Sequence, residues 1–181
     1  TGAAPVTIAN RGTTPVWRTV SISGVPKADL PEERNGYTVS RAVYNRDGTP
    51  ADLSKVPQSE LLVVVIKGSR TDPARAARTL VIDLLPAGFE IDNPRLVSSG
   101  ETSTLDWITE GVEPVNSEFR DDRFSAAFDR SADSSPVFTV AYVVRAVSPG
   151  RYVLPQAKVE DMYRPDRFGR TATGAIEITA R

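Results

Sequence analysis

The chain ends in PVFTVAYVVRAVSPGRYVLPQAKVEDMYRPDRFGRTATGAIEITAR, residues 136–181, and its strongest structural signal lies in this stretch. Runs of β-branched and aromatic residues alternate here with turn-forming residues, a pattern typical of β-strands. We expect strands at Val137–Val147, Arg151–Val159 and Gly174–Thr179. A Ser-Pro-Gly turn joins the first two strands, and the segment MYRPDRFGR is predicted to be a polar loop before the last.

Similar runs recur upstream. Leu61–Lys67 is continuously apolar up to its final lysine, which predicts a strand buried on both faces. Tyr37–Asn45 alternates, with Tyr37, Val39, Arg41, Val43 and Asn45 on one face. Other strands are expected at Pro5–Asn10, Pro15–Gly24, Thr79–Leu85, Phe89–Ile91, Arg95–Val97 and Phe124–Phe128.

Helical periodicity is nearly absent, so the pattern predicts an all-β fold: an antiparallel two-sheet β-sandwich with little helix. Roughly eight to ten strands are expected at this turn spacing. Ser98–Ser117 is expected to be a polar connection held to the body by Trp107. Asp83, within the run VIDLL, is expected on the exposed face or the edge of its strand.

Composition restricts the chemistry. The chain has 181 residues, a net charge of −1, no cysteine and no histidine. Ser-His-Asp and Cys-His machinery is therefore impossible within it, and we expect neither an enzyme nor a cofactor. The charge balance argues against nucleic acid as a partner. We expect one domain over residues 1–181, and a start at Thr1 without a signal peptide suggests a piece excised from a larger protein.

Two acidic clusters are candidates for calcium sites or catalytic dyads. They are Glu118 with Asp121-Asp122, and Glu160-Asp161. Calcium needs about six to eight oxygen ligands from a shaped loop, and the nearest such segment, Asn45-Arg46-Asp47-Gly48, lacks the EF-hand spacing. Surface ion pairs are the preferred interpretation, because Arg120 and Arg123 flank the first cluster.

The segment around Tyr163 combines aromatic side chains with arginines. Such a mixture can bind carboxylates or nucleic acid, or it can fold back so that its arginines pair with local acids. Asp161 and Asp166 are the nearest candidate acids. Both a folded-back loop and a docking loop for another domain remain open here. The docking-loop candidates are Glu160, Asp161, Met162, Arg164, Arg167 and Arg170.

Four ordered blocks carry a resemblance to a known family. They are PVWRTVSISGVP with the segment from Asn35 to Gly68, then Leu80–Leu96, Phe119–Asp129 and Arg145–Ile178. Together they resemble the C-terminal macroglobulin-like, receptor-binding-domain-like domain of bacterial α2-macroglobulins. The resemblance covers essentially the whole chain. It implies a non-catalytic domain of a periplasmic protease inhibitor, with the parent protein lipid-anchored to the inner membrane.

The resemblance also implies a role and partners. In this family a protease cleaves a bait region, and a conformational change entraps it, in some members with covalent capture by a thioester in a helical domain. Tyr163, in the motif EDMYRP, is the candidate for shielding that thioester. The implied partners are the thioester-type helical domain and macroglobulin domains of the parent, trapped proteases indirectly, and, by family analogy, a peptidoglycan-synthesis penicillin-binding protein.

The sequence is also compatible with two other functions. An Ig-like adhesion or pilus-type module would present its loops to an extracellular partner. A carbohydrate-binding sandwich would need a planar aromatic platform, for which Trp17 and Trp107 are the only tryptophans.

Overall fold

The structure is a computed structural model that describes residues 6–21, 23–24, 28–92 and 112–181. These residues contain strands and no helix, which confirms the all-β expectation. The strands are β1 (Glu33–Asn35), β2 (Tyr37–Asn45), β3 (Val56–Pro57), β4 (Leu61–Arg70), β5 (Ala77–Leu84), β6 (Phe89–Ile91), β7 (Asn116–Arg120), β8 (Arg123–Arg130), β9 (Val137–Ala146), β10 (Gly150–Leu154), β11 (Ala157–Asp161), β12 (Arg164–Arg170) and β13 (Gly174–Thr179).

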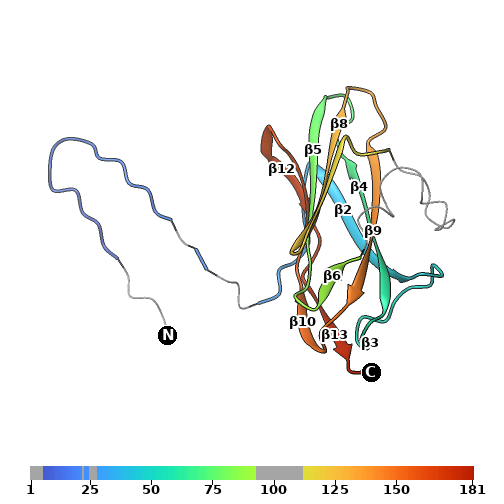
Figure 1. Ribbon diagram of the computed structural model, residues 1–181. Coiled ribbons are helices and arrows are strands. Elements are labelled where there is room, and N and C mark those ends of the chain that lie inside the picture. The colour runs from blue at the N-terminus through green and yellow to red at the C-terminus, as the bar shows by residue number, and fades with distance from the viewer. Residues whose placement is uncertain (1–5, 22, 25–27, 93–111) are drawn as a thin grey trace.

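Two larger sheets face each other (Figure 1). One has the order β1-β12-β11-β5-β8-β7, and the other has the order β2-β4-β9-β6. A small sheet, β10-β13-β3, lies at the end of the sandwich near the C-terminus. It contains a feature that the sequence pattern did not predict, because β13 and β3 pair in parallel.

Side-chain alternation explains how the sheets pack. In β2, Tyr37, Val39 and Val43 are buried on the predicted face. The run in β4 is buried on both faces, as predicted: Leu62, Val64 and Ile66 join the main core, while Val63 and Val65 pack in a second cluster with Ala141. Burial of such side chains from water is the main stabilising term.

Aromatic pairs fill the space between the facing sheets. Phe124 of β8 stacks on Tyr142 of β9, with ring centroids 4.6 Å apart. Phe128 and Phe138 of the same two strands lie 5.3 Å apart in a tilted arrangement. These rings fix β8 against β9 across the core.

Several expected strands are wrong. Residues 6–10, 15–21 and 23–24 form no strand and are exposed, with Trp17 99% accessible. An alternating pattern needs a neighbouring strand to supply hydrogen bonds, and this segment has none among the described residues. Pro5, Arg95–Val97 and Trp107 lie outside the described residues.

The expected strand Arg151–Val159 is also wrong as a single element. Its first half is β10, which pairs with β13, and its second half is β11, which pairs with β5 and β12. Pro155 lies at the break, where the missing N–H cannot join a ladder.

Two further segments differ from the prediction. The expected polar loop MYRPDRFGR is a short turn followed by β12. The connection expected to reach Ser117 instead ends in β7, which forms a hairpin with β8. Phe124–Phe128 is a strand, as predicted, within the longer β8.

Candidate docking hairpin

The predicted docking residues lie on one β-hairpin. Strand β11 runs up to Asp161, Met162 and Tyr163 form the turn, and β12 returns from Arg164. The pairing register shifts between Glu160 and Asp161, as in a β-bulge. A bulge strengthens the local twist and redirects side chains at the tip.

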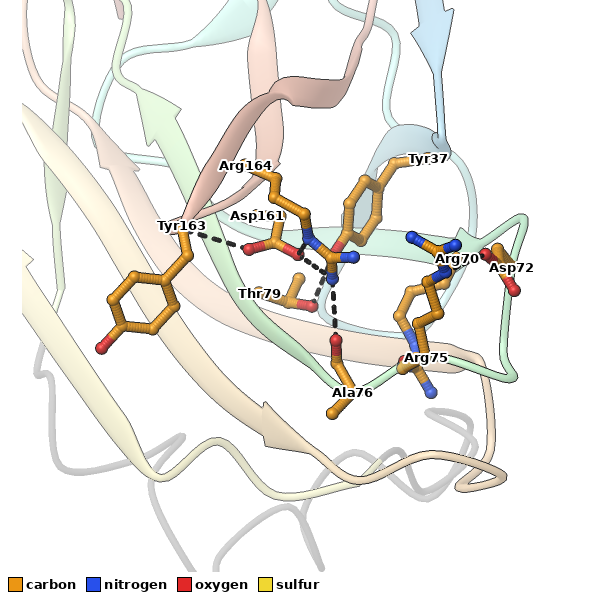
Figure 2. A network of polar contacts seen from close by, with 9 residues as sticks. All are labelled: Tyr37, Arg70, Asp72, Arg75, Ala76, Thr79, Asp161, Tyr163 and Arg164. Carbon is orange, nitrogen blue, oxygen red and sulfur yellow. Dashed lines mark hydrogen bonds and ion pairs between the residues drawn. The ribbon is translucent and has the colours of Figure 1, made fainter.

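Asp161 organises the turn (Figure 2). One carboxylate oxygen accepts the Tyr163 backbone N–H at 3.0 Å. The other accepts Nε and Nη2 of Arg164 at 2.9 and 2.6 Å. Asp161 is only 1% exposed, so these charge-assisted bonds compensate for burial of its carboxylate. The expected pairing of the arginine segment with a local acid is confirmed here.

The tip is also tied to the start of β5. The Met162 backbone N–H donates to the Arg78 carbonyl at 2.8 Å. Arg164 Nη2 donates to the Ala76 carbonyl at 2.7 Å (Figure 2). The turn therefore has a fixed backbone although its side chains face solvent.

Tyr163 projects from this braced turn. Its side chain points away from the polar network beneath it (Figure 2), and it is 80% exposed. Met162 beside it is 53% exposed. A large aromatic side chain held out on a fixed backbone is suited to a contact with another surface, because little backbone entropy remains to be lost.

The other candidate residues do not gather around Tyr163. Glu160 pairs with Lys158 on β11. Arg170 pairs with Glu33 of β1 at 3.3 Å and lies over the Phe168 ring at 4.6 Å. The Arg170 contacts hold β12 against β1, and the Glu160 pair lies along β11, so both side chains brace the sheet and do not reach the tip.

The acidic cluster around Glu118 forms the expected surface ion pairs. Glu118 pairs with Arg120 at 2.6 Å, and Asp122 with Arg123 at 3.1 Å. Within the residues that the structure describes, no group of three or more acidic side chains is placed to hold a metal ion. The same residues include no helix that is long and apolar enough to cross a membrane.

A small pocket lies beside the hairpin, and we call it the arginine pocket. Its lining residues come from the β1–β2 junction, β2, β4, the β4–β5 connection, the start of β5 and the hairpin. They are Gly36, Tyr37, Arg70, Asp72, Arg75, Ala77, Asp161, Arg164 and Arg167. Gly36 has φ +88°, and a Cβ there would meet Arg167 Nε at 2.9 Å, so glycine is required for this close approach.

Two polar side chains, Tyr37 and Asp83, are buried between the sheets. Burial raises the pKa of Tyr37, although its hydroxyl hydrogen-bonds Thr79 Oγ1 at 3.0 Å. Asp83 was expected to be exposed, and this is wrong: it is 1% exposed on the same face of β5 as Val81. Its partners are Arg41 of β2 and Tyr142 of β9. The alternation of β5 could have indicated its inward position.

Known proteins share this fold and sequence. The family described as Bacterial Alpha-2-macroglobulin MG10 domain matches residues 36–166. Alpha-2-macroglobulin of Escherichia coli (strain K12) is 34% identical over 94% of this chain and 10% of the relative's length. The crystal structure of Salmonella alpha-2-macroglobulin reacted with methylamine is 33% identical with a TM-score of 0.72, covering 86% of this chain and 10% of that one. Escherichia coli alpha-2-macroglobulin activated by porcine elastase is 30% identical with a TM-score of 0.70, covering 86% and 14%.

These likenesses and the facing sheets define a β-sandwich domain of the macroglobulin class. The chain belongs to the bacterial alpha-2-macroglobulin family and corresponds to its MG10 domain. It spans about a tenth of the length of the Escherichia coli and Salmonella relatives, which therefore contain much more protein around the matching domain.

Proposed function

We propose that this domain is a non-catalytic part of a protease-trapping protein, in which Tyr163 docks on a neighbouring domain and shields a reactive group there. The observation that carries the proposal is the 80% exposure of Tyr163 on a turn whose backbone is fixed by Asp161. A ring with one hydroxyl can exclude water from a neighbour and donate one hydrogen bond.

Two relatives support the proposal that the shielded group reacts with amines. The Salmonella relative was crystallised after reaction with methylamine, and the Escherichia coli relative was activated by elastase. We propose that the longer protein carrying this domain, called the parent protein below, likewise responds to proteases and contains a thioester in another domain. Its helical and macroglobulin domains are the direct partners of the hairpin, and trapped proteases are indirect ones.

The proposal extends to the location of the parent protein and to one further partner. The parent protein acts in the periplasm, is lipid-anchored to the inner membrane, and works beside a penicillin-binding protein of peptidoglycan synthesis. Cell fractionation of the parent tests the location, and recovery with the outer membrane or the cytoplasm would contradict it.

The test of shielding uses the parent protein with Tyr163→Ala and Tyr163→Phe. We expect faster thiol release with methylamine in Tyr163→Ala, and a smaller increase in Tyr163→Phe, which keeps the ring and removes the hydroxyl. Asp166→Ala is the matched control, since it removes an exposed side chain elsewhere on the same hairpin. Thiol release at the wild-type rate in Tyr163→Ala would contradict the shielding role.

A further inference from the structure

We propose that the arginine pocket binds one carboxylate side chain, Asp or Glu, from a neighbouring domain of the parent protein. This inference rests on the docking role proposed above and names the chemistry of the partner surface next to Tyr163. The pocket is placed for it, because Asp161 and Arg164, which brace the Tyr163 turn, also form part of the pocket lining.

Positive charge exceeds negative charge around the pocket. Its lining contains Arg70, Arg75, Arg164 and Arg167, but only Asp72 and Asp161. Asp161 is occupied by Arg164 at 2.6 Å, and Asp72 lies 3.6 Å from Arg75. Within the described part of the chain, Arg70 and Arg167 have no carboxylate partner. A concave site with this excess attracts anions.

Arg70 provides a second, independent observation. It is 4% exposed, and its guanidinium donates only to neutral acceptors. Nη1 donates to the Arg75 carbonyl at 2.6 Å, and Nη2 donates to the carbonyl and hydroxyl of Ser134 at 3.2 and 3.1 Å. Its Nε is buried without a hydrogen bond to any described residue.

An unpaired donor on a buried cation is costly. A buried polar group without a hydrogen-bond partner destabilises the folded state, and a charged group does so more than a neutral one. A carboxylate oxygen entering the pocket would accept from the unpaired Nε and balance the charge of Arg70. Carboxylate and guanidinium are matched in geometry as well as in charge.

The occupant is assigned to a neighbouring domain because of the hairpin. The exposed residues Met162 and Tyr163 lie in the chain between Asp161 and Arg164, which line the pocket, so a domain docked on this hairpin comes close to the pocket. The Escherichia coli relative is about ten times as long as this matching region, so further domains surround it there. One acidic side chain on the docked surface would fix its register, as rim charges do at interfaces.

The experiment reverses charge at the pocket in the parent protein. Arg75→Glu combined with Arg167→Glu is compared with Arg151→Glu, which makes the same kind of change on β10, away from the hairpin. Hydrogen exchange of residues 161–164 reports docking of the hairpin. We expect several-fold faster exchange in the pocket variant, and wild-type exchange in Arg151→Glu.

A milder variant guards against simple misfolding. Arg75→Gln with Arg167→Gln keeps polar side chains, and we expect a smaller increase in exchange with an unchanged melting temperature. Wild-type exchange in both pocket variants would overturn the proposal. So would stabilisation of the wild-type parent by inorganic phosphate that is lost in the pocket variants, because the pocket would then serve a free anion.

The two proposals fail separately. If Tyr163→Ala leaves thiol release unchanged while the pocket variants loosen the hairpin, the carboxylate contact stands and shielding is wrong. If Tyr163→Ala accelerates thiol release while the pocket variants exchange like wild type, shielding stands and the carboxylate contact is wrong.

Discussion

Arg41 and Asp83 form a buried ion pair that joins the two main sheets, with Arg41 Nη1 2.5 Å from Asp83 Oδ1. Their side chains are 5% and 1% exposed. The second carboxylate oxygen accepts the Tyr142 hydroxyl at 2.7 Å, and Arg41 Nη2 donates to the Pro155 carbonyl at 2.7 Å. β2, β5 and β9 therefore meet at one polar centre inside an apolar core, in a register that this network specifies.

Removing one member of the Arg41–Asp83 pair should destabilise the fold far more than replacing both members. Arg41→Met leaves a buried carboxylate without its cation, and we expect a loss of about 3–5 kcal/mol in the free energy of unfolding. Arg41→Met with Asp83→Leu should recover most of that loss, because no unpaired charge remains. Urea denaturation measures both. The control Arg151→Met, at a mainly exposed pair, should barely change the midpoint. Equal losses in the single and double variants would contradict this account.

The same pair predicts a pH dependence. Burial raises the pKa of Asp83, while Arg41 and the Tyr142 hydrogen bond oppose the rise. A raised pKa in the folded state means that stability from this group is present below the unfolded value, about 3.9, and is lost as pH rises through the folded value. Arg41→Met removes the positive charge that lowers the pKa of Asp83, so that pKa rises further. The stability deficit of Arg41→Met should therefore be smaller at pH 4 than at pH 7, as measured by urea denaturation at both. A deficit independent of pH would contradict this reasoning.

At alkaline pH, ionisation of two buried tyrosines should drive unfolding. Burial raises the pKa of Tyr37 and, together with the negative charge of Asp83, raises that of Tyr142 well above its ordinary value. In the unfolded chain tyrosine ionises near pH 10, so stability from these groups is complete below that pH and is lost as pH rises above it. Absorbance at 295 nm and circular dichroism should change together, because their ionisation accompanies unfolding. Tyr37→Phe should reduce the slope of stability against pH above 10, and an unchanged slope would count against the mechanism.

Close packing makes Gly68 of β4 intolerant of a methyl group. A Cβ there would lie 2.2 Å from Phe138 Cζ and 2.8 Å from the Thr38 carbonyl oxygen. We expect Gly68→Ala to lower the free energy of unfolding by about 1–3 kcal/mol, because overpacking forces the ring or the strand to shift. Gly174→Ala is the matched control, since its nearest contacts, with Leu154, begin at 3.6 Å. Similar urea midpoints for the two variants would contradict this account, because they would show that Phe138 or the strand shifts at little cost in stability.

The apolar and alternating patterns of single segments predicted which of those segments form strands and which of their faces are buried. The alternation of Tyr37–Asn45 and the apolar run of β4 each sit in a sheet with the faces that the sequence indicated. Pro15–Gly24 alternates as well, but no partner strand lies beside its described residues. A strand forms only where another part of the chain supplies a partner strand, and the pattern of one segment does not show which partner that is. The same limit hid the division of β10 from β11 and their assignment to different sheets.

The site was predictable in part for a similar reason. The sequence indicated that the Tyr163 segment carries arginines beside acids, and the pairing of Arg164 with Asp161 follows from their spacing across a turn. Its strand character was missed because β12 lies between β1 and β11, where polar side chains can still point to solvent. Arg70 is held beside the pocket by the nearby Arg75 carbonyl and by Ser134, which lies far along the chain. Nothing near Arg70 in the sequence indicates the contact with Ser134.

Asp161 is the positioning residue on which the hairpin prediction depends. Asp161→Ala removes the acceptor for the Tyr163 N–H and for Arg164, so Met162 and Tyr163 lose their fixed backbone. In the parent protein we expect several-fold faster hydrogen exchange at residues 162–164, and faster thiol release with methylamine. Asp166→Ala is the control, because it removes an exposed carboxylate from the same hairpin. Asp161→Asn should lie between wild type and Asp161→Ala, since an amide oxygen can still accept one of these bonds. If exchange accelerates while thiol release stays at the wild-type rate, the order of the turn does not contribute to shielding, and only the Tyr163 variants can then support that role.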